Sequence, residues 1–559
     1  MALANVSHKQ CVKFMGCSDS ENSNDEKCIG CGYNKEDHLN ECEQDKWTQS
    51  AQKWRDQLCL YNIESGIERD CRIRFINQVD NIEKMARFVK VSADNDPKAV
   101  VDVLLQEFNL HKPKIVISIA GAPTLVQFKT DILQNRFRDD FIKAATATST
   151  WILTNGTNFG FDGFIADALK QDTLLEWIGL VEATFHLIGV CNWNCIEKHE
   201  EINKWLKNRK RAEQFKEAEE IEEYEKLIAE HPNVLEDNFE YRYKPQKYVS
   251  RQARNFYMPL NPATTHFLCV ENGMKLIADQ ETDMRCSIDK YVASKEGLNI
   301  PTVLLLFGGN ISAFKRVAHA LREGMTVVIC QDSGDAANIL SRALSMTAKQ
   351  SLTKKNEAKL IKDIENLFCK KPSKGLLYTD DPFTVAKHMG YLKECLEYPE
   401  MIVKYRIGDP ETTLDGAILK ALLCGNTEIE DKLKLTVKWN KCDKNVTDIL
   451  DNEKDINLRP NIEDIILDCL LNEQIEFIQQ FMEYGLKFSE VFKIDLISKL
   501  YQKSISHNYT FRKLLRSVNG KKRCYTLKDV YNIIYKYCSV VLRFAMHFAE
   551  TLKTSSVNS

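Results

Sequence analysis

Three short turns of small and polar residues in this sequence are candidates for holding a phosphate group. They are Thr154-Asn155-Gly156-Thr157-Asn158 with Gly160, then Gly308-Gly309-Asn310, and then Asp332-Ser333-Gly334. Each turn follows an apolar run and precedes a segment with helical periodicity. A helix N-terminus exposes unpaired N–H groups with partial positive charge, and glycine lets a ligand approach the backbone closely. Together the turns would suit a phosphate or diphosphate, and the need of any α/β domain for glycine at such places explains them equally well.

Other phosphate-binding and catalytic patterns are missing from the sequence. No G-x-x-x-x-G-K-[ST] and no clean G-x-G-x-x-G is present, so ATPase and ordinary NAD-binding functions lose support. No Ser/His/Asp or Cys/His arrangement has a local signature of nucleophilic catalysis. We therefore do not expect an enzyme.

A cluster near the amino terminus has the residue types of a zinc site. Cys28-x-x-Cys31 with His38 and Cys42 could supply four tetrahedral ligands. The second pair is loosely spaced, however, and a tight turn with buried thiols explains the same residues. We favour the turn, so no metal is required. The 19 cysteines are scattered along the chain without a signal peptide, which is typical of reduced thiols.

The middle of the chain has the pattern of a parallel sheet. Continuously hydrophobic runs alternate with helical segments, as expected for strands that helices cover on both faces. The runs span residues 114–121, 149–156, 183–193, 265–273, 302–310 and 325–334. We predict an α/β, Rossmann-like, doubly wound and mostly parallel sheet. The carboxyl edge of such a sheet, where the three turns would lie, is where open α/β folds bind ligands.

Three regions are expected along the chain. Residues 1–55 are an irregular segment containing cysteines, and residues 56–376 are the α/β domain, interrupted by a charged helical insertion at about 197–245. Residues 377–559 are predicted to be an all-α helical-repeat region. Two similar segments, 418–430 and 466–476, support the repeat.

Composition narrows the class of protein. The 559 residues are 44% hydrophobic and 28% charged, which is typical of a globular protein. The net charge of -3, without a dense basic stripe, disfavours nucleic acid as a partner. No predominantly apolar run reaches the roughly 20 residues of a membrane-spanning helix, so we expect no transmembrane segment in this chain.

Several motifs resemble the cytosolic amino-terminal region of melastatin-type transient receptor potential (TRPM) cation channels. "KCIGCGY" is similar to a Cys-Gly element of the family, and "PKIVISIAG" followed by "STWILTNGTNFG" is similar to its first homology block. "IPTVLLLFGGN", "VVICQDSGDAANIL" and "IEDIILDCLLNEQIEFIQQFMEYGL" resemble later parts of the region. The resemblance covers about residues 25–510.

The resemblance implies a Rossmann-like domain of the SLOG group, followed by helical layers that lead to a pore domain. Intact members are tetrameric, calcium-permeable cation channels, which would place this chain on the cytoplasmic face of the plasma membrane among channel subunits. In some members the α/β domain binds ADP-ribose or a related nucleotide. Carried onto this sequence, the candidate contacts are Thr154, Gly156, Thr157, Asn158, Gly160, Gly308, Gly309, Asn310, Ser333, Gly334 and Arg285. Arg285 would pair with a phosphate bidentately.

Several departures from the family pattern weaken the expectation of tight ADP-ribose binding, and two of them lie in the turns. The family's T-G-G is Thr154-Asn155-Gly156 here, so one glycine is replaced by a residue with a side chain. Asp335 follows Gly334 and brings a negative charge near any phosphate.

The resemblance leaves two functions open and disfavours a third. The chain is either the sensing and assembly region of a TRPM-type channel or a soluble, pore-less relative that regulates channel subunits. The wider SLOG group also includes nucleotide hydrolases with a P-G-G-x-G-T-x-x-E signature. Here Phe307 replaces the proline, and Lys315 and Arg316 stand where the glutamate is needed, so hydrolysis is disfavoured.

Overall fold

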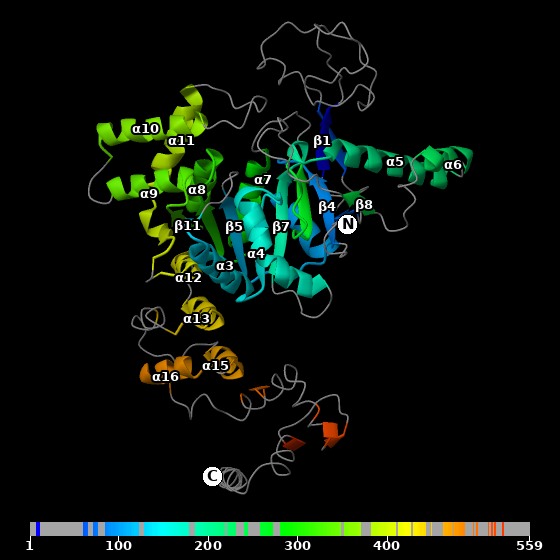
Figure 1. Ribbon diagram of the computed structural model, residues 1–559. Helices are drawn as coiled ribbons and strands as arrows, with labels where there is room; N and C mark the ends of the chain where they lie inside the picture. The colour runs from blue at the N-terminus through cyan, green and yellow to red at the C-terminus, as the bar shows by residue number, and fades with distance from the viewer. Residues whose placement is uncertain are drawn as a thin grey trace. The chain divides into compact units, whose positions relative to one another are not determined.

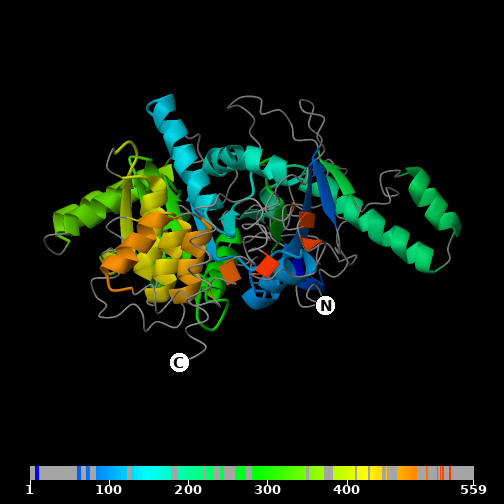
Figure 2. The same ribbon diagram turned by 90° about the horizontal axis from the view of Figure 1, so that it is seen from below.

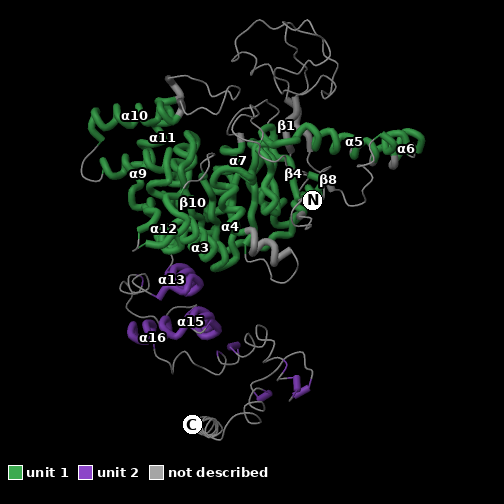
Figure 3. The backbone as a smooth tube through the Cα atoms, in the orientation of Figure 1, with its two compact units in different colours: residues 1–425 green, residues 426–559 purple. Residues whose placement is uncertain are grey.

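The chain divides into two compact units, Met1–Gly425 and Asn426–Ser559 (Figure 3). The computed structural model describes residues 7–11, 60–64, 71–75, 84–121, 128–177, 185–218, 221–230, 240–243, 258–271, 280–347, 352–369, 382–409, 412–425, 429–442, 462–472 and 474–486, with isolated positions up to residue 529. Within these residues, no helix is long and apolar enough to cross a membrane.

The first unit is built on a ten-stranded sheet (Figure 1). Its strand order is β12-β11-β10-β5-β6-β7-β9-β4-β3-β8. The strands are β3 (Arg72–Phe75), β4 (Lys84–Val91), β5 (Ile115–Gly121), β6 (Thr150–Thr154), β7 (Phe185–Asn192), β8 (Glu240–Tyr243), β9 (His266–Val270), β10 (Thr302–Phe307), β11 (Thr326–Gln331) and β12 (Ile402–Arg406). A separate antiparallel pair joins β1 (Ser7–Cys11) and β2 (Leu60–Glu64).

All pairs in the large sheet are parallel except β3 with β4. Every residue of β6 and β10 is buried, as the continuously hydrophobic runs predicted. The six predicted runs correspond to β5, β6, β7, β9, β10 and β11. The prediction of a mostly parallel, doubly wound α/β sheet is therefore confirmed.

Helices pack on both faces of this sheet, which is why its strands carry little polar sequence. One face carries α2 (Pro97–Asp102), α7 (Gln280–Ala293), α8 (Ser312–Arg322) and α9 (Asp335–Thr347), with α10 (Lys354–Cys369) and α11 (Pro382–Cys395) packed on α9 and α8. The other face carries α3 (Asp131–Thr146), α4 (Gly160–Trp177) and α12 (Leu414–Gly425). An aromatic cluster fills the space between α3, α4 and the sheet, with Phe161 stacked on Phe307 at 4.1 Å between ring centroids.

The charged insertion forms two helices, α5 (His199–Glu217) and α6 (Ile221–Glu230), followed by β8 at the end of the sheet. The two helices extend to one side of the sheet in both Figure 1 and Figure 2.

The first unit reaches Gly425, past residue 376 where the sequence pattern indicated the end of the α/β domain. The reason is β12, which pairs in parallel with β11 and adds a strand at the edge of the sheet. Its burial alternates because Lys404 and Arg406 are exposed, so it lacks the continuous hydrophobic pattern of the inner strands.

The second unit contains α13 (Ile429–Lys438), α15 (Ile462–Leu471) and α16 (Ile475–Glu483). Their apolar faces share one core, in which Leu433, Ile466, Phe477 and Phe481 are fully or almost fully buried. Gly485 has φ +100° one residue beyond the C-cap of α16, Tyr484, a conformation typical of a helix stop.

A histidine pair in the sheet predicts that acid destabilises the first unit. His186 on β7 and His266 on β9 lie 6.1 Å apart between ring centroids, and burial lowers their pKa values to about 4 and about 3. The second histidine also faces Arg87, which disfavours its charged form further. Below pH 6.5 these histidines are protonated in the unfolded chain but stay neutral in the folded chain. The free energy of unfolding therefore decreases as pH falls from 6.5 toward 4.

We expect His266→Asn to reduce the pH dependence of stability by about 1.4 kcal/mol per pH unit between pH 6 and pH 4.5. Urea unfolding at several pH values measures this slope. The buried carboxyls change stability in the opposite sense, because burial raises the pKa of Asp289, so the comparison must be with the unsubstituted chain. His111→Asn, at an exposed position, removes only a secondary cause of the lowered pKa of His186 and should change the slope much less. Equal slopes for the wild type and His266→Asn would contradict the prediction.

Candidate functional site

The sheet brings the three predicted turns to one edge. The turns after β10 and β11 follow adjacent parallel strands, and the turn after β6 lies one strand beyond β5. Strand β5 lies between the later strand β10 and the following strand β6, so the chain order reverses there. Such a reversal point is where ligands bind in open α/β sheets. The predicted grouping at the carboxyl edge is therefore present.

In the first turn, close packing determines the use of glycine. Gly156 has φ +70°, and a Cβ there would lie 2.9 Å from both Gly189 Cα and Phe267 Cε1. Thr154 and Thr157 are buried, and the Thr154 Oγ1 accepts a 3.0 Å hydrogen bond from the Gly156 N–H. Glycine at this position therefore allows the turn after β6 to pack closely against β7 and β9.

A neighbouring segment lies across this first turn. Asn158 N–H donates to the Pro259 carbonyl at 2.8 Å, and Asn261 N–H donates to the Gly156 carbonyl at 2.9 Å. The Asn158 Oδ1 also accepts a hydrogen bond from the Asn261 side chain at 3.2 Å. The backbone N–H groups of Gly156 and Asn158 thus already have acceptors within the protein.

The second and third turns bind each other. The Ser333 Oγ accepts a 2.8 Å hydrogen bond from Gly308 N–H and lies 2.5 Å from the Cys330 carbonyl, to which it donates. Gly308 and Gly309, with φ +63° and +83°, accept hydrogen bonds through their carbonyls from Ala337 and Ala336 at the start of α9. Asn310 is partly exposed, and its carbonyl accepts from Ala313 N–H in the first turn of α8.

Two further glycines at the edge have positive φ, and one of them has open space beside it. Gly334 has φ +100°, and a Cβ built on it would have no heavy atom within 4 Å. Gly160 has φ +58° and begins α4. Open space at Gly334, beside the amino end of α9, is the feature of this edge that best suits an approaching ligand.

A carboxyl group of the chain itself occupies the amino end of α4. Asp162 accepts hydrogen bonds from Asn155, at 3.4 Å from the backbone N–H and 2.9 Å from the side-chain amide. Burial raises the pKa of Asp162, while nearby Arg285 lowers it. The replacement of the family's middle glycine by Asn155 thus supplies a second donor to an internal anion.

Arg285 lies beneath the edge, on α7, with 1% of its surface exposed. Its guanidinium donates to the Asn155 Oδ1 at 2.5 Å and to the carbonyls of Ile119 and Leu153 at 2.7 and 2.8 Å. Burial and the neighbouring Arg316 lower its pKa to about 10. The structure therefore places Arg285 where it joins the carboxyl ends of β5 and β6, and a direct pairing with a phosphate remains a prediction.

A second buried arginine completes this network. Arg316 on α8 donates to the Ile119 carbonyl at 2.7 Å and to the Ser118 Oγ at 3.0 Å, and Ser118 in turn donates to the Asp289 carboxylate at 2.9 Å. Burial raises the pKa of Asp289, and the two arginines lower it. The buried side chains of Ser118, Asp162, Asp289 and Arg316 were not predicted from the sequence.

The same geometry bears on hydrolase chemistry. Lys315, at the place where a hydrolase would carry its glutamate, forms an ion pair with Asp283, and the next residue, Arg316, is buried in this network. In the part of the chain that the structure describes, no group of three or more histidine, cysteine or acidic side chains is arranged to hold a metal ion. The predicted ligands Cys28, Cys31, His38 and Cys42 lie outside the described residues.

Replacing Gly156 with alanine tests whether packing governs the first turn. The added Cβ would meet Gly189 and Phe267 at 2.9 Å, and the positive φ adds strain. We expect a loss of about 2 to 5 kcal/mol in the free energy of unfolding, against about 1 to 2 kcal/mol for Gly334→Ala, which has positive φ but open space. Urea denaturation of both variants makes the comparison, and equal losses would refute it.

This fold defines a Rossmann-like α/β domain, a class of domain in which ligands bind at the carboxyl edge of the sheet. A profile described as the SLOG domain in TRPM matches residues 86–235 and 221–377. These stretches cover more than half of the chain, so the protein belongs to the family of TRPM proteins with a SLOG domain.

Curated relatives agree with this assignment. The chain is 24% identical over 534 residues to transient receptor potential cation channel subfamily M member-like 2 of Nematostella vectensis, covering 94% of this chain and 31% of that protein. It is 26% identical over 428 residues to subfamily M member 7 of Homo sapiens, covering 74% and 20%, and 22% identical over 517 residues to subfamily M member 2 of Mus musculus, covering 89% and 30%. The chain thus spans about a fifth to a third of the length of these relatives, and it corresponds to their amino-terminal region.

Proposed function

We propose that this chain is the cytosolic amino-terminal assembly and sensing region of a TRPM-type, calcium-permeable cation channel. The observation that carries the proposal is the match that runs through both units, over 94% of the chain, to the amino-terminal part of one channel relative. In this role the chain would associate with channel subunits in a homotetramer at the cytoplasmic face of the plasma membrane.

The site supports assembly better than catalysis. Loop amides at the carboxyl edge hydrogen-bond to Ser333, Thr154 and Asp162, so the turns are held in a fixed conformation without a ligand. A rigid edge of this kind presents a constant surface to neighbouring subunits.

Co-purification with a channel tests the proposal. The tagged chain would be co-expressed with a full-length TRPM-type subunit. The control is co-expression with a subunit from a transient receptor potential subfamily that lacks a SLOG domain, and the amounts of subunit recovered with the chain are compared. We expect recovery with the TRPM-type subunit at least tenfold above that control. Equal recovery would reject the assembly role, and recovery with unchanged channel current would favour a binding module over a regulator.

ADP-ribose or a related nucleotide is a second candidate, now as a ligand of the same domain. The open space at Gly334 favours it, since a diphosphate could approach the amino end of α9 there. Asp335 opposes it with a negative charge in the first turn of that helix.

Calorimetric titration of the full chain with ADP-ribose tests this ligand. Gly334→Leu fills the open position and should remove the binding heat. Gly324→Leu is the matched control, because Gly324 also has positive φ and no heavy atom within 4 Å of its would-be Cβ, but lies in the turn between α8 and β11 at the opposite edge. No heat at millimolar ligand, or equal loss in both variants, would remove the nucleotide from the proposal.

A further inference from the structure

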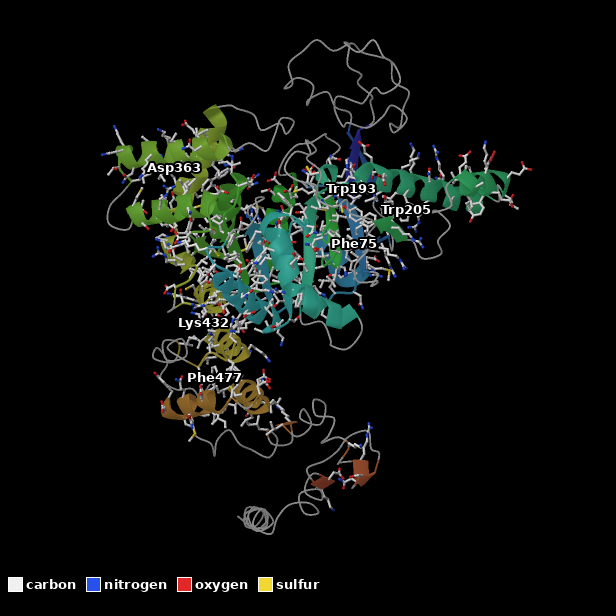
Figure 4. The ribbon with its side chains drawn as sticks, viewed as in Figure 1. Phe75, Trp193, Trp205, Asp363, Lys432 and Phe477 are labelled. Atoms are coloured by element: carbon white, nitrogen blue, oxygen red, sulfur yellow. The ribbon has the colours of Figure 1, made fainter. Side chains whose placement is uncertain are left out.

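The helical insertion is a rigid arm that is firmly attached at one end. Near the start of α5, Ile202 and Trp205 are buried in a core with Phe75 and Trp193, three of which are labelled in Figure 4. The buried Lys90 lies 4.8 Å from the Trp193 ring centre and donates to Asn203 of α5 at 2.5 Å. The first half of α5 is thus locked to the sheet by packing and hydrogen bonds.

The far half of the arm is more exposed in the side chains that the structure describes. Among these, Ala212 is the last buried residue of α5, and none on α6 is buried. With 19 residues, α5 is about 28 Å long, which carries α6 away from the sheet in Figures 1 and 2.

Apolar side chains follow one side of α6 nevertheless. Ile221, Tyr224 and Ile228 recur at the three- and four-residue spacing of a helical face. Ile221 is 66% exposed, one of the most exposed large apolar side chains among the described residues. Its neighbours Tyr224 and Ile228 are partly exposed, so α5 covers this face incompletely.

The charges of the arm are separated between its two helices. Helix α6 contains four glutamates and one lysine, a net charge of -3. Helix α5 contains six basic and four acidic residues, a net charge of +2. Lys204 and Arg211 on α5, and Glu222, Glu223 and Glu225 on α6, are all exposed.

From this separation we infer that the arm docks on the arm of a second copy of this chain. Around the ring of a tetramer, the acidic α6 of one arm lies against the basic α5 of the next arm, and Ile221 enters each contact. Such a head-to-tail contact closes into a ring when the rotation between neighbouring copies matches the symmetry of the tetramer. The inference rests on the assembly role proposed above and names a surface for it.

Charge exchange between two variants of the full-length chain tests the contact. The acidic-helix variant carries Glu222→Lys, Glu223→Lys and Glu225→Lys, and the basic-helix variant carries Lys204→Glu and Arg211→Glu. We expect each variant alone to self-associate at least tenfold more weakly than the wild type in sedimentation velocity at low salt. Mixing the two should restore association, because each altered helix then meets its complement. A control with Glu365→Lys, Glu397→Lys and Glu400→Lys, all exposed elsewhere in the first unit, should associate like the wild type.

The apolar part has its own variant. Ile221→Asp should weaken self-association about tenfold or more, whereas Ile132→Asp, 78% exposed on α3, should not. A wild type that stays monomeric, or a mixture that does not recover, would overturn the inference, since the charges would then act only within each arm. If co-purification with channel subunits persists in that case, the arm contact alone is rejected and the assembly role stands.

Discussion

Replacing Arg285 with alanine is expected to lower the free energy of unfolding by about 3 to 5 kcal/mol. The guanidinium is 1% exposed and donates to Asn155, Ile119 and Leu153. Its removal leaves two buried carbonyls without this donor and takes a positive charge from the neighbourhood of the buried Asp162. Urea denaturation followed by intrinsic fluorescence measures the loss.

Two further variants make this expectation specific. Arg342→Ala removes an arginine that is 47% exposed and paired with Asp363 on the surface, and should cost no more than about 1 kcal/mol. Arg285→Lys keeps the charge but not the planar fork that reaches three acceptors, so it should recover less than half of the loss. Unchanged stability of Arg285→Ala, with loss of ADP-ribose binding alone, would instead establish the arginine as a ligand contact.

The inner part of the fold follows from local sequence because its signals are strong and redundant. β10 reads "TVLLLF" and is buried at every position, and its neighbours in the sheet share that pattern. Outer strands carry weaker signals, because some of their residues are exposed or half-buried. β3, next to the edge strand β8, reads "RIRF" and the edge strand β12 reads "IVKYR", and such short segments do not distinguish a strand from a loop.

The candidate site was predictable in position but not in its internal contacts. The three turns reach one edge because parallel strands end at the same side of a sheet. Several side-chain contacts at and beneath the turns depend on residues far away in sequence. Asp289 lies 171 residues from its hydrogen-bond partner Ser118, and Arg285 lies 130 residues from Asn155. Spacing rules within a single motif carry no information about such pairs.

Gly156 also shows that a residue type alone does not reveal why it is used at a given position. The sequence suggests Gly156 as a ligand contact, because phosphate loops and tight turns both use glycine. The structure shows a specific packing reason, with Gly189 and Phe267 at 2.9 Å from a would-be Cβ. A packing reason does not exclude a ligand, but it removes the need for one to explain the residue.

Breaking the buried ion pair between Lys90 and Glu271 is the second change for which we expect a large effect. The two groups lie 3.2 Å apart at the carboxyl ends of β4 and β9, and their side chains are 7% and 4% exposed. Lys90→Met leaves a carboxylate buried without its cation, and we expect a loss of about 3 to 5 kcal/mol in the free energy of unfolding. Lys290→Met, at a pair in which the lysine is 54% exposed, should cost less than about 1 kcal/mol.

The double variant separates the pair's own contribution from the penalty of an isolated charge. Lys90→Met with Glu271→Leu removes both charges and fills the site with apolar side chains, so stability should return to within about 2 kcal/mol of the wild type. Asn203, which accepts from both Lys90 and Trp193, would keep one of those two donors and continue to hold α5. A double variant as unstable as the single one would mean that the ion pair itself fixes the arm to the sheet. In that case the self-association of the arm should weaken together with stability, because a loosely held α5 can no longer present α6 in one position.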